Sequence, residues 1–152
     1  MYHYVEYVKD QGDTIRQSLN IIPSVFDAQV KTLQDYGYTF LTAKDLADIL
    51  DEKKEAPKKS VLLTFDDGHW DVFTDVLPIL QKYHIKATVY IAPGLLNGSD
   101  FLTIEQLEKI ASTSAVEIAA HTVNHVWLKG KSLELVQKEV LESKVMLEEL
   151  IH

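Results

Sequence analysis

Apolar and polar positions divide the chain into two alternating kinds of segment. Short runs of β-branched and aromatic residues are typical of strands, and longer segments whose apolar residues recur every three or four positions are typical of helices. We expect strands at 1–8, 38–41, 60–65, 85–92 and 115–120. We expect helices at 22–36, 43–53, 70–83, 104–112 and 133–150. Strands that alternate with helices predict an α/β fold in which helices cover parallel strands.

Capping residues mark several of these boundaries. Three helix starts have a hydroxyl three residues before a side chain that can complete a capping arrangement. The pairs are Ser24 with Asp27, Thr42 with Asp45, and Thr103 with Gln106. Gly37 and His84 stand where helices should end in the left-handed conformation, which is less favourable for His84 because it carries a Cβ.

The last predicted helix carries an apolar stripe that should pack against a sheet or a neighbouring helix. The stripe consists of Leu133, Val136, Val140, Leu147 and Leu150, and Ser143 interrupts it. The only charge run, at 51–59, is expected to be a solvated loop and separates no domains. Residues 1–152 are therefore interpreted as a single domain.

Charge and composition narrow the classes of function. With 15 basic and 23 acidic residues the net charge is -8, which disfavours nucleic acid and anionic membrane surfaces as partners. The absence of cysteine excludes disulfides, thiolate metal sites and cysteine nucleophiles. No apolar run approaches the roughly 18 residues of a membrane span, and no signal peptide follows Met1. Localisation stays open.

Two carboxylates follow the predicted strand at 60–65 directly. Asp66, Asp67 and Gly68 form a turn at its end, and adjacent like charges at a partly buried turn call for a cation or strong hydrogen-bond donors. Parallel strands gather chemistry beyond their carboxyl ends, which favours a functional turn. The alternative is a surface turn in which Asp66 caps the helix beginning near Trp70.

A pair of histidines follows the strand at 115–120. His121 and His125 are four residues apart, a spacing that in a helical turn places both rings on one face at chelating distance. Hydrogen-bonded or solvated histidines are the alternative interpretation. Together with Asp67, however, the two imidazoles would leave coordination positions open for water and substrate, as in a catalytic metal site. Imidazole ligands favour zinc or a neighbouring transition ion over calcium.

Three further residues are candidates for substrate binding. His3 could point from the first strand into the same pocket, His69 follows the aspartate turn at its rim, and Trp127 could stack on sugar rings. Trp70 could stack in the same way. The alternatives are ordinary packing for His3 and the tryptophans and an exposed helix start for His69.

These motifs resemble a known family. The segments 64–68 (Thr-Phe-Asp-Asp-Gly) and 121–125 (His-Thr-Val-Asn-His) are similar to the first two motifs of the polysaccharide deacetylases, the NodB-homology domains of carbohydrate esterase family four. The likeness extends through 1–5, 77–80 and 86–88. It implies a distorted (β/α) barrel, similar to a TIM barrel, and metal-dependent hydrolysis of N-acetyl groups on an amino-sugar polymer such as poly-N-acetylglucosamine.

The same resemblance implies a role for each motif residue. Asp66 would be the catalytic base, Asp67, His121 and His125 would bind one divalent metal, and Thr122 would help to shape the second motif. The resemblance suggests a secreted or cell-surface protein, and the opening segment is more similar to deacetylases of secreted polysaccharides than to those of peptidoglycan.

Other family motifs are missing from the sequence. The family pattern continues with an arginine motif ending in proline, an aspartate-tryptophan motif and a leucine-x-x-histidine motif that supplies the general acid. The only arginine is Arg16, and Glu149, not leucine, stands three residues before His152. Ala119-Ala120 also replaces a common glycine-serine pair. We therefore expect an N-terminal portion of the domain, with the barrel incomplete at the C-terminus and the general acid unidentified.

The resemblance and these departures leave three hypotheses about function. The first is a metal-dependent deacetylase. The second is a non-catalytic member that binds metal or sugar without turnover, and the third is a metal phosphohydrolase, which fits less well because magnesium favours oxygen ligands. An open sheet edge could pair with a second copy of the chain, giving a homo-oligomer.

Overall fold

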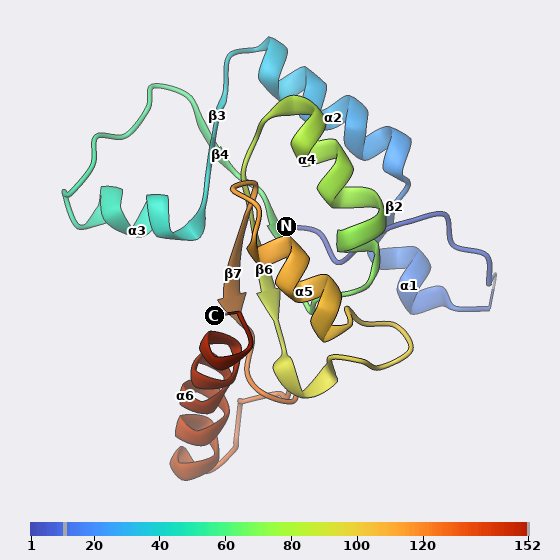
Figure 1. Cartoon of the computed structure of the whole chain (residues 1–152), viewed down its shortest axis with the longest axis vertical. Coiled ribbons are helices and arrows are strands. Elements are labelled where there is room, and N and C mark those ends of the chain that lie inside the picture. The colour runs from blue at the N-terminus through green and yellow to red at the C-terminus, as the bar shows by residue number, and fades with distance from the viewer. Residues whose placement is uncertain (11, 152) are drawn as a thin grey trace.

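The computed structural model describes residues 1–10 and 12–151, in which short strands alternate with helices (Figure 1). The strands are β1 (Tyr4–Val5), β2 (Asn20–Ile21), β3 (Thr39–Leu41), β4 (Ser60–Leu62), β5 (Thr64–Phe65), β6 (Ala87–Ile91) and β7 (Val116–Ala120). The α-helices are α1 (Thr14–Leu19), α2 (Pro23–Asp35), α3 (Ala43–Leu50), α4 (Leu77–Tyr83), α5 (Ile104–Ala111) and α6 (Leu133–Leu150). A π-helical turn, η1 (Val72–Val76), leads into α4, and a 3-10 turn, η2 (Pro93–Leu95), follows β6.

Every pairing between two of these strands is parallel, which confirms the predicted fold class. β5, β6 and β7 form one sheet in that order, β1 pairs with β2, and β3 pairs with β4. β4 leads into β5 through Leu63, whose carbonyl accepts a hydrogen bond from Thr88 of β6. Tyr2 pairs with Phe65 on the other side of β5. The predicted strand at 60–65 is thus one path interrupted at Leu63.

The helices surround these strands unevenly. Figure 1 shows α2, α4 and α5 gathered on one side of the strands, α3 projecting away, and α6 beyond the tip of β7. β7 pairs only with β6 among the described residues, so its other edge is open. Pairing of that edge with another copy of the chain stays a prediction.

The core lies between the sheet and the helices. Phe26 of α2 and Phe65 of β5 are fully buried and pack edge to face with ring centroids 5.5 Å apart, and Tyr2 stacks on Phe65 at 5.3 Å. Val89 and Ile91 of β6 are also fully buried. β6 is the central strand of its sheet, and its apolar residues hold the two flanking strands in fixed positions.

Two of the three predicted N-caps are confirmed. Thr42 and Thr103 each accept a hydrogen bond from the residue three positions on and form complete capping boxes. The Ser24 prediction is wrong, because α2 begins at Pro23 with Ile22 as its N-cap. Proline suits the first helical position because it has no N–H to satisfy. Asp27 instead accepts hydrogen bonds from two residues at the end of α4.

The predicted helix ends and loop agree well with the structure. Gly37 and His84 both adopt the left-handed conformation, with φ of 75° and 52°. The charge run at 51–59 contains no helix or strand and is largely exposed, as predicted.

Other elements differ from the prediction. The first strand is shorter than predicted, and the helix expected at 70–83 begins with η1. The sequence pattern did not predict α1 or β2.

The buried face of α6 differs from the predicted stripe. Leu147 is buried, but Leu133 and Val140 are 72% and 46% exposed. Glu139 and Ser143 are buried instead. The helix therefore turns a partly polar face inward, for a reason that lies in the loop after β7. No helix of residues 1–10 and 12–151 is long and apolar enough to cross a membrane. His152 lies outside the described residues.

Candidate metal centre

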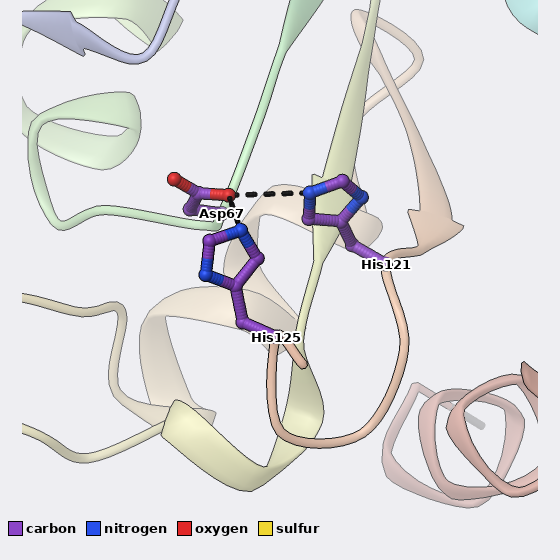
Figure 2. A group of neighbouring side chains, drawn as sticks. All are labelled: Asp67, His121 and His125. Carbon is purple, nitrogen blue, oxygen red and sulfur yellow. Dashed lines mark ion pairs between the residues drawn. The ribbon is translucent and has the colours of Figure 1, made fainter. Parts of the chain in front are cut away.

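Two turns at the same edge of the sheet carry the candidate ligands. Asp66 and Asp67 follow β5, and the loop 121–125 follows β7. Because the strands are parallel, their carboxyl ends meet at one edge, where sites of α/β proteins form. Asp67, His121 and His125 meet at this edge, although Asp67 is far from the two histidines in the sequence (Figure 2).

The two histidine side chains converge on one carboxylate oxygen of Asp67. Oδ1 of Asp67 lies 3.3 Å from Nε2 of His121 and 3.1 Å from Nε2 of His125. The two imidazole rings face each other with centroids 5.2 Å apart. One ligand atom from each residue lies within 4.8 Å of the others, a spacing that a single bound ion can span.

The aspartate turn needs unusual backbone angles. Asp67 and Gly68 have φ of 75° and 79°. A Cβ on Gly68 would also lie 3.2 Å from the side chain of Ile91. Glycine at this position therefore lets the turn pack closely on β6 and directs the Asp67 carboxylate toward the histidines.

The histidine loop does not form the predicted helical turn. Residues 121–125 are irregular, and both Thr122 and His125 have positive φ, at 61° and 53°. The two rings therefore meet through a loop that turns back on itself, not through stacking on one helix face. His121 is fixed at its start by a hydrogen bond from its N–H to the carbonyl of Ile91.

Electrostatics favour an ionised Asp67. Burial alone would raise the pKa of this carboxyl, but its contacts with His121 and His69 outweigh burial and hold the pKa well below its usual range. The pKa of His121 is raised by Asp67 against the opposing effect of burial, and Asp66 adds to that rise. A negative charge is therefore maintained at the centre of the cluster.

This donor set fits a divalent cation. Oδ1 of Asp67 is buried and has no hydrogen-bond partner among the described residues, although two Nε2 atoms lie within 3.3 Å. A buried carboxylate oxygen without a partner is costly, and a cation would satisfy it together with both ring nitrogens. One carboxylate and two imidazoles are ligands typical of zinc and its neighbours, and they leave positions open.

His69 lies behind Asp67 and not at an exposed helix start. The residue is 5% exposed, and its ring packs between Tyr4 and Phe101, with centroids 4.1 Å and 4.8 Å away. Nδ1 lies 3.1 Å from the carbonyl oxygen of Asp100, and Nε2 lies 3.6 Å from Oδ2 of Asp67. This position favours support of the Asp67 carboxylate, and substrate binding by His69 stays a prediction.

Asp71 is a buried acid that the sequence interpretation missed. It is 1% exposed, and its carboxylate accepts a hydrogen bond from the N–H of Val5. Burial raises the pKa of Asp71 to about 6, against the lowering effect of the Val5 N–H. The position of this residue in a polar stretch before η1 gave no signal of burial.

Trp127 and His3 are the remaining candidates. Trp127 is 77% exposed and lines a cavity of about 570 Å³ together with His121 and His125. The alternative of ordinary packing is therefore wrong for Trp127. Asp66 is half-buried, and its N–H donates to the carbonyl of Tyr2, which places His3 beside the same turn. Substrate contacts of His3 and Trp127 stay predictions.

Parallel strands with an acidic turn and a histidine loop at one edge define an α/β protein with a candidate metal centre. Residues 53–152 match the family model of the polysaccharide deacetylases. The chain belongs to this family.

Individual relatives agree with that assignment. YxkH of Bacillus subtilis is 35% identical over 135 residues, which are 89% of this chain and 48% of YxkH. The poly-β-1,6-N-acetyl-D-glucosamine N-deacetylase of Staphylococcus epidermidis is 29% identical over 84% of this chain and 46% of its own length. The chain thus spans about half the length of these curated relatives.

A solved structure confirms the predicted architecture. The deacetylase PplD of Streptococcus pyogenes, in complex with acetate, matches with a TM-score of 0.88 and 30% identity. The match covers 99% of this chain and 67% of PplD. Such deacetylases have a (β/α) barrel fold, the fold class expected from the sequence.

Proposed function

We propose that this protein acts as a metal-dependent N-deacetylase that removes acetyl groups from an amino-sugar polymer similar to poly-N-acetylglucosamine. The observation that carries the proposal is the convergence of Asp67, His121 and His125 at the carboxyl ends of β5 and β7. The family assignment supports it, and so do relatives that are named as deacetylases of this polymer.

The proposed chemistry assigns one task to each motif residue. Asp67, His121 and His125 would hold a divalent metal, with zinc favoured by the two imidazoles. When bound, such an ion lowers the pKa of a water molecule and polarises the acetyl carbonyl. Asp66, which directly precedes the ligand Asp67, would accept the proton from the attacking water. Its half-buried side chain keeps contact with solvent, which a base that exchanges protons requires.

Recognition of the polymer would use the surface beside the histidines. Trp127 offers a flat apolar face next to the cavity, as aromatic side chains do when they stack on sugar rings. His3 and His69 are the remaining candidates for polar contacts. A net charge of -8 suits a neutral polymer whose deacetylated product is cationic.

Metal content and acetate release together test this proposal. A full-length form of the protein would be loaded with zinc, dialysed and analysed by elemental mass spectrometry, and acetate would be measured with oligomers of β-1,6-N-acetylglucosamine. We expect stoichiometric zinc and acetate release that falls by about 100-fold or more in Asp66→Asn, the effect of losing a general base. Asp51→Asn, in the exposed loop after α3, is the matched control. No bound metal, or full activity of Asp66→Asn, would falsify the proposal.

The same measurements would separate the deacetylase from the two other candidate functions. A protein that binds zinc and the oligomer but releases no acetate would be a metal- and sugar-binding member without turnover. Phosphate-ester hydrolysis faster than acetate release would instead support a metal phosphohydrolase.

A further inference from the structure

A buried carboxylate on α6 faces the histidine loop. Glu139 is 4% exposed, and among the described residues it has no lysine or arginine within ion-pair distance. Charged side chains are seldom buried unless their oxygens are satisfied by strong donors. The partners of Glu139 therefore indicate why it lies inside.

All of those partners belong to the loop between the two histidines. Oε2 of Glu139 accepts the N–H groups of Val123 at 2.8 Å and of Asn124 at 2.9 Å. Oε1 accepts the side-chain amide of Asn124 at 2.9 Å. Hydrogen bonds from backbone N–H groups to an ionised carboxylate are short and strong. One side chain thus binds both central residues of the loop.

The loop needs such an anchor because its backbone is unfavourable. Thr122 and His125 both occupy the left-handed region that non-glycine residues rarely adopt. Such conformations persist only where the surroundings hold them. From the other side, the N–H of Gly94 donates to the carbonyl of Val123 at 2.8 Å. The loop is therefore held between η2 and α6.

We propose that Glu139 is a positioning residue that fixes the loop 121–125 in its metal-binding shape before the cation arrives. α6 then forms part of the metal centre although it supplies no ligand. This inference rests on the proposed metal site. It also explains why the buried face of α6 contains a charged residue where an apolar stripe was predicted.

Hydrogen exchange of the metal-free chain gives the first test. The backbone N–H groups of Val123 and Asn124 should exchange faster in Glu139→Ala than in the wild type, whereas those of β6 should be unchanged. Glu142→Gln is the matched control, because Glu142 is exposed on the same helix. Circular dichroism and thermal unfolding would establish that each variant is folded. Unchanged exchange at both amides would overturn the proposal.

Zinc affinity, measured by competition with a chelator, gives the second test. Groups that orient metal ligands typically change affinity by 10- to 100-fold when they are removed, and we expect a loss of about this size in Glu139→Ala. Glu139→Gln keeps one oxygen for the two N–H groups, so its affinity should lie between those of Glu139→Ala and the wild type. The cobalt absorption spectrum at saturation should keep the wild-type pattern, because the ligands are unchanged.

The outcomes separate this inference from the proposed function. Equal zinc affinity of the wild type and Glu139→Ala would overturn the inference and leave the metal site intact. A wild type without zinc affinity would overturn the proposed function, and hydrogen exchange would still decide whether Glu139 anchors the loop. If Glu139→Ala does not fold, the same comparisons are made with Glu139→Gln, whose wild-type exchange and affinity would count against the proposal.

Discussion

Tyr4 of β1 packs on the ring of His69, with centroids 4.1 Å apart. Tyr4 also contacts Arg16, whose guanidinium lies 4.7 Å from the tyrosine ring centroid. Since Nε2 of His69 lies 3.6 Å from Oδ2 of Asp67, residues near the N-terminus support the candidate metal centre. This connection depends on contacts between distant parts of the chain. One substitution at His69 can separate the packing role of this residue from its polar role.

Replacing His69 by Phe should weaken zinc binding more than it weakens folding. The phenyl ring keeps the stacking volume between Tyr4 and Phe101 but removes the polar contact with Asp67. The carbonyl of Asp100 still accepts the N–H of Trp70, so no backbone group loses its only partner. We expect roughly ten-fold weaker zinc binding, measured by chelator competition, and a parallel urea denaturation curve. Unchanged affinity would show that His69 acts only in packing.

Asp71→Asn should change how the free energy of unfolding depends on pH. The pKa of Asp71 in the folded protein, about 6, is above the ordinary value of 3.8. Between these values the folded protein holds a proton that the unfolded chain has lost, so stability falls as pH rises through this range. Relative to the wild type, the variant should gain roughly 3 kcal/mol from pH 3.5 to 7.

Urea denaturation across that pH range, with a chelator present, measures the difference. Other titrating groups contribute equally to both proteins and cancel. Asp51→Asn is the control, because this carboxylate is exposed. Curves for wild type and Asp71→Asn that stay parallel at every pH would contradict the expected burial effect.

The parts of the fold that the sequence predicted are those with local causes. The capping boxes at Thr42 and Thr103 and the left-handed end at His84 depend on residues within one turn, so the pattern reveals them. The Asp-Asp-Gly turn and the histidine pair were visible for the same reason, because each lies directly after a strand.

The features that were missed depend on contacts between distant residues. Nothing in the sequence near Glu139 shows that a loop more than ten positions earlier will take up its carboxylate. The burial of His69 and Asp71 likewise depends on β1, whose residues come from the start of the chain. The histidine spacing was interpreted as a helical turn because no local pattern reveals the left-handed angles at Thr122 and His125. Those angles depend on the contacts that the distant residues Glu139 and Gly94 make with the loop.

Gly94→Ala should weaken zinc binding by displacing the histidine loop. A Cβ at this position would lie 2.7 Å from the carbonyl oxygen of Val123 and 2.6 Å from Oδ1 of Asn124. The backbone of the loop must move, whereas in Gly12→Ala an added Cβ would meet only the flexible side chain of Asp10. We expect lower zinc affinity for Gly94→Ala alone, measured by calorimetry. Equal affinity of both variants would refute this expectation.

Zinc should stabilise the folded chain through Asp67 and not through Asp66. At about 100 times its dissociation constant, a ligand that binds only the folded state adds about 2.7 kcal/mol to the free energy of unfolding. Urea denaturation with zinc and with a chelator would measure this gain. Asp67→Asn should abolish most of it, and Asp66→Asn should retain it. Equal losses in the two variants would contradict the separate roles of ligand and base.

Trp127→Ala should reduce binding of N-acetylglucosamine oligomers without loss of stability. The side chain is 77% exposed, so its removal should change the free energy of unfolding by about 0.5 kcal/mol or less. Trp127→Phe keeps an aromatic face and should bind more tightly than the alanine variant. Calorimetry with the zinc-loaded chain measures both, and Leu133→Ala, at an exposed apolar residue of α6, is the control. Oligomer affinity that is equal in all variants would exclude stacking.

The order of β5, β6 and β7 has a consequence for how the chain reaches its native alignment. The candidate ligands follow β5 and β7, which do not touch along their pairing edges because β6 lies between them. A slip of one residue moves a strand by about 3.3 Å, as far as the whole distance from Asp67 to either imidazole. Chelation is therefore possible only for molecules whose strands are in the native register. A bound cation would thus stabilise the native register over registers shifted by one residue.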